Sequence, residues 1–531
     1  MAHTARRITA TLIVRKVSLL PSLESKVHVS AASSSPRFQP VSTARLPESI
    51  GRLQQVLGPE KLYIVGGILR DSLLTAIEQG HDTLDLVQEN DWDLATPLRP
   101  KEVMARLRSA GIKAIPIGIE HGTVAALING ETIEITTFRH DVESIDGRHA
   151  VVRFADSLEE DLQRRDFTVN AFAMDVERGA LIDLFGGIDD LCQRCIRTVG
   201  EPVERFHEDY LRMLRAIRFA AKLEGRIDDA THAAIQKTAP RITQIAAERI
   251  RDELMKMLGY PRPSHGFALM HETLLLPYIL PELEAGFGCW QNRFHADDVA
   301  WHTLHTTDAV RPSEPLVRWM ALMHDLGKVP KKLFKPEKGD YVFYGHQYAS
   351  RKIAKRTMLR LRFSNREIEK TTSVVEHHMY NLKPDLSDAA IKRFVRKLGR
   401  ENVDDFLRMR MADRRGNRLN EPGYEKGIFH FVRQLRRIEK AEEAMSLRDL
   451  AINGHDLMAM GLQPGPLFSL LLDRLLDEVL ENPEANTREQ LTERAQTLAH
   501  EYSATGTIPP ANNANQDDES EEACANQRPE E

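Results

Sequence analysis

The pattern of apolar and polar residues changes near residue 190. Between residues 60 and 185, short β-rich apolar runs alternate with segments of helical periodicity. From about residue 190 to residue 503, nearly every segment has apolar residues at helical spacing. The pattern therefore predicts an α+β fold, in which a small head with a mixed sheet and helices is followed by a long all-α body.

Three stretches have readable local structure. The run LYIVGGILRDSLL predicts a buried strand, a turn at Gly66-Gly67 and a helix directly after it. In TVAALINGETIEITTF, the central Asn129-Gly130 pair predicts a β-hairpin, because both residue types tolerate positive φ. Further on, FHEDYLRMLRAIRFAAKL (residues 206–223) carries acids and arginines on an apolar background and predicts one continuous helix.

The composition is that of a multi-domain globular protein. The chain has 531 residues, too many for a single core, and 42% of them are hydrophobic. The net charge is −6, so a nucleic-acid partner would have to meet a local basic face. Only four cysteines are present, which predicts a reducing, cytoplasmic location, and we interpret the Cys192-x-x-Cys195 pair as structural. No run of 18 apolar residues exists, so no membrane span is expected.

The Gly66-Gly67 turn is a candidate phosphate-binding element. Glycines at a strand-to-helix turn let backbone N–H groups approach a phosphate, and the N-terminus of a helix favours an anion. Arg70, in the first turn of the predicted helix, adds a charged donor. Two glycines alone would also fit an ordinary tight turn, so the interpretation depends on the acidic residues that follow.

Three carboxylates of the head form a candidate Mg²⁺ site. Asp91 and Asp93 in NDWDLATPL are two residues apart, so on a strand they share one face. Like charges this close repel unless a cation lies between them, and Mg²⁺ prefers oxygen ligands together with substrate phosphates. Glu134 leaves the apolar face of the predicted hairpin and supplies a third carboxylate. This set is what two-metal nucleotidyl transfer requires.

At this point a family resemblance is clear, over residues 60–225 and again near 452–466. The head resembles the polymerase-β-type nucleotidyltransferases and, more narrowly, the class II tRNA nucleotidyltransferases, or CCA-adding enzymes, and their relatives the poly(A) polymerases. The matching segments, in family order, are VGGILRD, NDWDLAT, HGTVAALINGETIEITTFRHD, LEEDLQRRDFTVNAFAMD, LIDLFGG, IRTVGEPVERFHEDYLRMLRAIRFA and NGHDLMAMGLQPGP. The resemblance implies addition of C, C and then A to the 3′ end of tRNA from CTP and ATP, without a nucleic-acid template.

Base selection can be reasoned chemically. Cytosine and adenine both offer an exocyclic amino donor beside a ring-nitrogen acceptor, and a carboxylate with a guanidinium matches that pattern. Asp209 and Arg212, expected on one helix face, match the family's E-D-x-x-R motif together with Glu208. The nucleotide-binding residues that the resemblance implies are Gly66, Gly67, Arg70, Arg165, Asp166, Asn170, Asp209, Arg212, Arg215 and Arg218.

The segment 139–154 lies where the family has a flexible loop that is associated with addition of the terminal A. The chain keeps Arg139 and Arg148 there but has His149-Ala150 where the family often shows Arg and Pro. The resemblance therefore predicts the loop but leaves its detailed contacts open.

The body carries a second set of candidate metal ligands, and its order resembles the HD phosphohydrolases. The set is His302, His324, Asp325, His346, His377, His378 and Asp413. Histidine and carboxylate ligands from several helices can bind one or two divalent metals, whose identity the residues do not define. His295 and His305 are read as ordinary residues. The expected chemistry is metal-assisted hydrolysis of phosphate esters; a domain that only supports tRNA is the alternative.

A tRNA partner would be recognised at its acceptor stem and elbow through backbone shape and basic residues. Candidate segments are 328–338, 351–362 and 431–440, although each alone would also fit a solvated helix face. Two rival functions remain: a poly(A) polymerase of the same family, and an HD phosphohydrolase whose head only binds nucleotide. Oligomeric state is left open.

The predicted domain boundaries follow from these patterns. Residues 1–47 carry seven Lys or Arg and one acid, which is typical of a transit peptide or a disordered tail, so an organelle is the alternative to the cytoplasm. The expected units are a tail (1–47), a nucleotidyltransferase head (48–190), a neck with nucleotide-selecting helices (191–258), a helical body with the HD domain at about 300–415 (259–415), a helical tRNA-binding region (416–508) and a disordered acidic tail (509–531).

Overall fold

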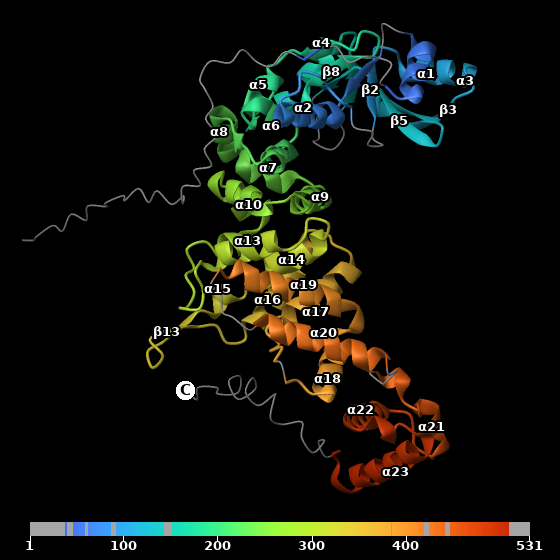
Figure 1. Cartoon of the computed structure of the whole chain (residues 1–531), viewed down its shortest axis with the longest axis vertical. Coiled ribbons are helices and arrows are strands. Elements are labelled where there is room, and N and C mark those ends of the chain that lie inside the picture. The colour runs from blue at the N-terminus through green and yellow to red at the C-terminus, as the bar shows by residue number, and fades with distance from the viewer. Residues whose placement is uncertain are drawn as a thin grey trace, which may run out of the picture.

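The computed structural model shows an elongated molecule with the sheet-containing head at one end (Figure 1). Helices form the neck, the body and a small C-terminal bundle at the other end. The prediction of an α+β head followed by a helical body is confirmed. The structure describes residues 38–39, 46–58, 62–86, 92–142, 151–383, 385–418, 424–440 and 446–508. The predicted N-terminal tail lies outside these residues at 1–37 and 40–45, and the predicted C-terminal tail lies outside them at 509–531.

The head is built on a seven-stranded mixed sheet with the order β3-β4-β5-β2-β1-β8-β9. Its strands are β1 (Tyr63–Val65), β2 (Asp93–Thr96), β3 (Lys113–Gly118), β4 (Thr123–Ile128), β5 (Glu131–Thr137), β8 (Phe172–Asp175) and β9 (Leu181–Asp183). The pair β2–β5 is parallel and the other pairs are antiparallel. The head helices are α1 (Glu48–Leu57), α2 (Gly67–Gln79), α3 (Pro100–Ser109) and α4 (Leu158–Gln163).

Two glycine-containing turns fix the geometry of the head. Asn129 (φ 52°) and Gly130 (φ 85°) join β4 to β5 and confirm the predicted hairpin. Gly66, at φ 86°, joins β1 to α2, and a Cβ there would lie 2.5 Å from the carboxylate oxygen Oδ2 of Asp93. Only glycine therefore lets this turn approach Asp93 so closely.

The neck shows one departure from the sequence-based expectation, because residues 206–223 do not form one helix. Helix α6 (Pro202–Glu208) ends at Glu208, Asp209 is extended (φ −154°, ψ 106°), and α7 (Leu211–Leu223) begins two residues later. A local turn accompanies the break: the Asp209 carboxylate accepts a hydrogen bond from the backbone N–H of Leu211, two residues on, at 3.0 Å. The expectation that Asp209 and Arg212 share one helix face is therefore wrong.

The remaining elements complete the neck, body and C-terminal bundle. Neck helices are α5 (Gly187–Cys192), α8 (Asp229–Thr238), α9 (Ala247–Leu258) and α10 (Pro263–Glu272), with the short pair β10 (Cys195–Ile196) and β11 (Arg226–Ile227). Body helices are α11 (Leu276–Ile279), α12 (Pro281–Glu284), α13 (Val299–Ala309), α14 (Pro315–Met323), α15 (Lys328–Lys331), α16 (His346–Arg360), α17 (Asn365–His377), α18 (Asp388–Leu398), α19 (Val403–Gly416) and α20 (Tyr424–Lys440). The C-terminal bundle contains α21 (Gly454–Ala459), α22 (Pro466–Glu481) and α23 (Arg488–Thr505).

Two further hairpins project from this framework. One consists of β6 (Arg139–Val142) and β7 (Val151–Phe154), which pair at the base of the predicted A-specific loop. Residues 143–150 of that loop lie outside the described residues. The other consists of β12 (Leu333–Lys335) and β13 (Asp340–Val342) and extends from the side of the body (Figure 1).

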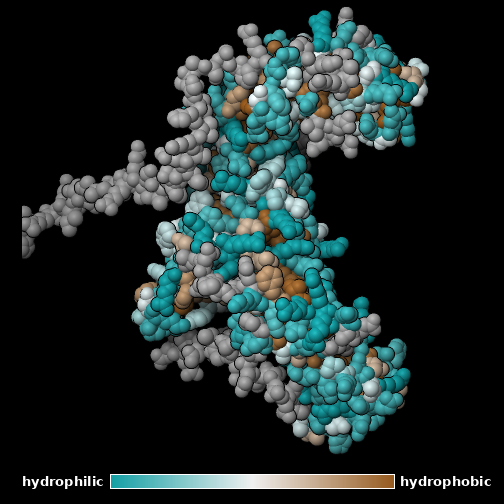
Figure 2. All heavy atoms as spheres, in the orientation of Figure 1, coloured by the Kyte–Doolittle hydropathy of each residue, from teal (hydrophilic) through white to brown (hydrophobic). Residues whose placement is uncertain are grey.

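One apolar core crosses the boundaries between head, neck and body, and another belongs to the C-terminal bundle alone. One cluster of buried residues runs from the head through the neck into the first body helices, whereas the C-terminal bundle has a cluster of its own around Leu471 and Leu498. The face of the molecule in Figure 2 is mostly hydrophilic between scattered apolar patches. Among the described residues, no helix combines the length and the apolar character needed to span a bilayer.

Candidate functional site

Two of the three predicted head carboxylates lie side by side. Asp93 opens β2 and is in register with Glu134 on the parallel neighbour β5, so both side chains share one face of the sheet. Trp92 lies on the other face, is buried, and accepts a hydrogen bond at its carbonyl from the Glu134 N–H at 3.1 Å. Asp91 lies outside the described residues. Adjacent carboxylate oxygens at a strand edge suit Mg²⁺.

Beside these carboxylates, a pocket of about 440 Å³ lies between head and neck. The predicted nucleotide-binding residues that line it are Gly66, Gly67, Arg70, Arg165, Asp166, Asn170, Asp209, Arg212 and Arg215, together with Asp93. Four lining residues were not predicted from the sequence: Arg164, Leu211, Phe219 and Arg249. Segments far apart in the chain thus converge on one arginine-rich pocket, whose charge suits an anionic ligand.

A buried hydrogen-bond chain holds the arginines of the pocket in place. Arg70 Nη1 donates to Asn170 Oδ1 at 2.7 Å, and Asn170 Nδ2 donates to Asp166 Oδ1 at 3.0 Å. Arg215 forms an ion pair with the other oxygen of Asp166 at 2.6 Å. Burial works against the ionised form of Asp166, but Arg215 and these hydrogen bonds outweigh it and hold the pKa of that carboxyl below its usual range.

The ring of Phe219 makes cation–π contacts with arginines of this region. The guanidinium carbons of Arg70, Arg215 and Arg218 lie 5.0, 5.5 and 4.1 Å from the centre of its ring. Arg218 is itself buried, where it donates to Glu253 at 2.5 Å and to the Tyr260 hydroxyl at 2.7 Å. Arg218, although predicted to bind nucleotide, therefore does not line the pocket and instead supports the ring.

The predicted base-selecting residues both face the pocket but have separate partners. Asp209 forms an ion pair with Arg249 of α9 at 2.7 Å. Arg212 pairs with Glu208 and donates to the backbone carbonyls of Arg205 at 3.2 Å and Arg164 at 3.3 Å. The acceptor Asp209 and the donor Arg212 are thus each held by partners of their own.

A second polar cluster lies in the body and centres on Asp325. Its Oδ2 lies 3.2 Å from the Nε2 atoms of both His302 and His324, and its Oδ1 lies 3.3 Å from His346 and 3.4 Å from His378. Asp413 completes the group, with its Oδ1 3.2 Å from His302 Nε2. All but Asp413 are at least nine-tenths buried. Six of the seven predicted HD residues are therefore brought together.

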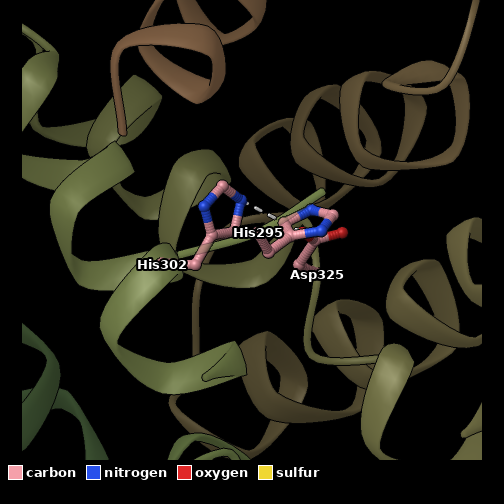
Figure 3. A group of neighbouring side chains, drawn as sticks. All are labelled: His295, His302 and Asp325. Atoms are coloured by element: carbon pink, nitrogen blue, oxygen red, sulfur yellow. Dashed lines mark ion pairs between the residues drawn. The ribbon is translucent and has the colours of Figure 1, made fainter. Parts of the chain in front are cut away.

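The remaining predicted ligand lies apart, and an unpredicted one takes part. His377 donates through Nδ1 to the Ser373 carbonyl at 2.8 Å and belongs to none of the potential metal-binding groups of the described residues. His295, read from the sequence as ordinary, forms such a group with His302 and Asp325 (Figure 3). Lys328 bridges Asp325 at 2.7 Å and His295 Nε2 at 3.1 Å.

The imidazoles of the cluster are oriented as metal ligands usually are. Nδ1 of His324, His346 and His378 contacts a backbone carbonyl three residues earlier, at 2.7, 2.9 and 2.7 Å. Since a carbonyl only accepts, Nδ1 carries the proton and Nε2 points into the cluster. The buried Nε2 atoms of His302 and His324 have no hydrogen bond of good geometry in the described structure, which fits a site for a cation.

The charges of the cluster shift its pKa values strongly. Burial disfavours the charged form of His324, but Asp325 and Asp413 outweigh it and raise its pKa to about 10. Burial lowers the pKa of His378 to about 4 and, with Lys328, that of His295 to about 3. The carboxylates of Asp325 and Asp413 thus attract positive charge, either a proton on His324 or a metal ion.

Comparison with known proteins gives the family. The model for the poly A polymerase head domain matches residues 62–197, that for the probable RNA and SrmB-binding site of polymerase A matches 226–287, and that for the putative tRNA nucleotidyltransferase domain 2 matches 344–495. An A-adding tRNA nucleotidyltransferase from Deinococcus radiodurans is 32% identical over 454 residues, which cover 83% of this chain and 96% of that protein. The chain therefore belongs to the class II tRNA nucleotidyltransferases, the family of the CCA-adding enzymes.

Other similarities are more local or structural. A CCA-adding enzyme from Limosilactobacillus reuteri is 46% identical over 223 residues, which cover 42% of this chain and 51% of that protein, so the chain spans about half the length of this curated relative. Among solved structures, the CCA-adding enzyme of Bacillus stearothermophilus in complex with CTP is similar with a TM-score of 0.63 and 27% identity, over 86% of this chain and 98% of that one.

Proposed function

We propose that the chain adds C, C and A to the 3′ end of tRNA from CTP and ATP, without a nucleic-acid template. The observation that carries this proposal is the juxtaposition of Asp93 and Glu134 with a pocket that presents a carboxylate and several guanidinium groups. Relatives of known structure support the substrates, since one binds CTP and another, at 20% identity, is a complex with tRNA.

In this proposal the residues divide the work by chemistry. Asp93 and Glu134, with Asp91 as the predicted third ligand, would hold Mg²⁺, which activates the attacking 3′-hydroxyl and neutralises the triphosphate. The Gly66-Gly67 turn offers backbone N–H groups to phosphate at the start of α2. Arg165 and Arg215, beside Asp166, add positive charge for the triphosphate.

Asp209 and Arg212 would select the base; they line the pocket just before α7 and in its first turn. The Asp209 carboxylate accepts a hydrogen bond from the exocyclic amino group of C or A, and the Arg212 guanidinium donates one to the ring nitrogen. Uracil and guanine present the reverse pattern and would leave both protein groups unmatched. The predicted body and C-terminal region, residues 259–508, would hold the acceptor stem and elbow of tRNA through basic residues.

The test is nucleotide incorporation by the purified chain on tRNA transcripts that lack the 3′ end. Addition of two C residues and one A supports the proposal. Unlimited addition of A to any RNA would instead support a poly(A) polymerase, and addition of A alone to tRNA ending in CC would support an A-adding enzyme like the Deinococcus relative.

We further propose that the Asp325 cluster is a metal-dependent phosphohydrolase site of the HD type. The supporting observation is the set of Nε2 atoms and carboxylate oxygens that converge within 4.8 Å in each potential metal-binding group. The residues that would hold the metal are His302, His324, Asp325, His346, His378 and Asp413. The metal would supply an activated water; water oxygen bonds to phosphorus, the ester P–O bond breaks, and the leaving oxygen takes up a proton. Release of phosphate from phosphate esters with Mg²⁺, Mn²⁺, Ni²⁺ or Co²⁺ tests this.

A further inference from the structure

The Asp325 cluster opens into a pocket of about 1410 Å³ whose rim is rich in aromatic side chains. The rim is formed by the β12–β13 hairpin and the N-terminal end of α16. Tyr341, Tyr344 and Tyr348 line it and are 37, 43 and 49% exposed, and Phe294, which also lines it, is 54% exposed. Four exposed rings around one pocket do not pack into a core, which is typical of a surface that a ligand covers.

The rim is also basic. The pocket is lined by seven cationic residues, namely Arg293, Lys328, Lys331, Lys338, Lys352, Arg410 and Arg414, and by four acidic ones, Asp325, Glu337, Asp340 and Asp413. Two of these four acids belong to the cluster itself. Lys331 and Lys352 are exposed, and no described residue forms an ion pair with either of them. The mouth of the pocket therefore favours an anionic ligand.

Aromatic and basic side chains are interleaved there. Lys338 Nζ lies 5.5 Å from the ring centre of Tyr344; Lys332, which does not line the pocket, has its Nζ 4.2 Å from the ring centre of Tyr341. The guanidinium carbon of Arg293 lies 5.2 Å from the ring centre of Phe294. Basic grooves with aromatic platforms are how proteins bind single-stranded nucleic acid without base-specific hydrogen bonds, because every base has a face that can stack.

We propose that this rim is a nucleotide-binding subsite, in which the terminal base of a single-stranded RNA end stacks on Tyr341 or Tyr348 while its 3′-phosphate extends to the Asp325 cluster. The proposal rests on the phosphohydrolase site proposed above and names its substrate class. A small phosphate ester without a base would need only the cluster and its nearest cations. The rings give such a ligand no advantage, whereas they add contact area for a base.

The test uses the full-length chain and a fluorescein-labelled tetraribonucleotide that ends in a hydrolysis-resistant 3′-phosphorothioate. A second probe is identical except that its terminal nucleotide lacks the base. Binding of both is measured by anisotropy for wild type and for the Tyr341→Ala/Tyr348→Ala double variant. Tyr278→Ala is the matched control, because Tyr278 is 43% exposed on α11 and does not line the pocket.

The double variant is expected to weaken binding of the base-bearing probe by roughly fivefold or more, with the baseless probe unchanged. The Tyr278 variant is expected to change neither, and CCA addition by the double variant is expected to stay at the wild-type level, which shows that it is folded. Equal binding of the base-bearing probe by wild type and double variant would overturn the inference, as would an equal loss for both probes.

Failure of this inference is distinguishable from failure of the hydrolase proposal. Hydrolysis of phosphate esters that does not depend on the tyrosines or on a base rejects the nucleotide subsite alone. Base-dependent binding at the rim in a chain that hydrolyses no phosphate ester with any of the four metals supports the subsite and rejects the hydrolase.

Discussion

The substitution Asp209→Ala separates a base-selecting role from a structural one. If the Asp209 carboxylate accepts a hydrogen bond from the amino group of C or A, removal of the carboxylate should reduce discrimination against UTP and GTP. The side chain of Asp209 is 28% exposed, so the penalty for an unmatched polar group should fall in the lower part of the usual range, about 1–2 kcal/mol, a factor of roughly 5 to 30.

The structural contribution of Asp209 should be small. Its partner Arg249 is 52% exposed, and ion pairs of this kind contribute less than about 1 kcal/mol to the free energy of unfolding. The loss of the hydrogen bond from the Leu211 N–H to the Asp209 carboxylate adds about 1 kcal/mol. The variant should therefore remain folded at 25 °C, and its nucleotide selectivity can be measured.

The assay is the ratio of CTP to UTP incorporation on tRNA that lacks CCA, for Asp209→Ala against wild type. Arg215→Ala is the control, because loss of a phosphate-binding arginine should weaken the binding of all four nucleotides alike. A fall in the ratio by about fivefold or more is expected for Asp209→Ala alone. An unchanged ratio in folded protein would refute the base-selecting role and leave Asp209 with a structural role alone.

Four further predictions follow from the two sites. Asp93→Ala should abolish nucleotide addition and retain phosphate release; near-normal CMP incorporation would contradict the metal assignment. His324→Ala combined with Asp325→Ala should do the reverse, and persistent hydrolysis would exclude the cluster. Shortening the segment 139–154 should retain CC addition and lose the final A, whereas equal loss of both would indicate a folding defect. The pKa of His324 is raised to about 10, so between pH 6 and 9 a bound metal must displace a proton from this side chain, and metal affinity should rise roughly tenfold per pH unit. Calorimetry that shows no pH dependence of metal binding would contradict this.

The order of head motifs predicts the sheet-containing head and its hairpin, and the family resemblance implies nine of the residues that line the pocket, but not Arg164, Leu211, Phe219 or Arg249. These features are local: a glycine pair, an Asn-Gly turn and alternating acids each have a direct backbone consequence. The break at Asp209 was missed because no Pro or Gly marks it. There the Asp209 carboxylate accepts a hydrogen bond from the Leu211 N–H and forms an ion pair with Arg249, forty residues further along the chain.

The body illustrates why the rest could not be predicted. His295 precedes α13 in an irregular segment, so no periodicity marks it, and only the fold brings it to Asp325. His377 and His378 are neighbours in sequence, yet successive residues of a helix point in different directions, and only His378 faces the cluster. The sequence marks residues 328–338 as a basic segment, but only the fold places the aromatic residues that follow it beside the pocket.

The most direct test of the account is template-free addition by the purified chain to three tRNA transcripts, ending before the first C, after CC and after CCA, with each labelled NTP in turn. The account predicts incorporation of C but not A into the first transcript when CTP or ATP is supplied alone, of A into the second, and of nothing into the third, with UTP and GTP rejected throughout. Continued addition of A to all three transcripts would contradict it.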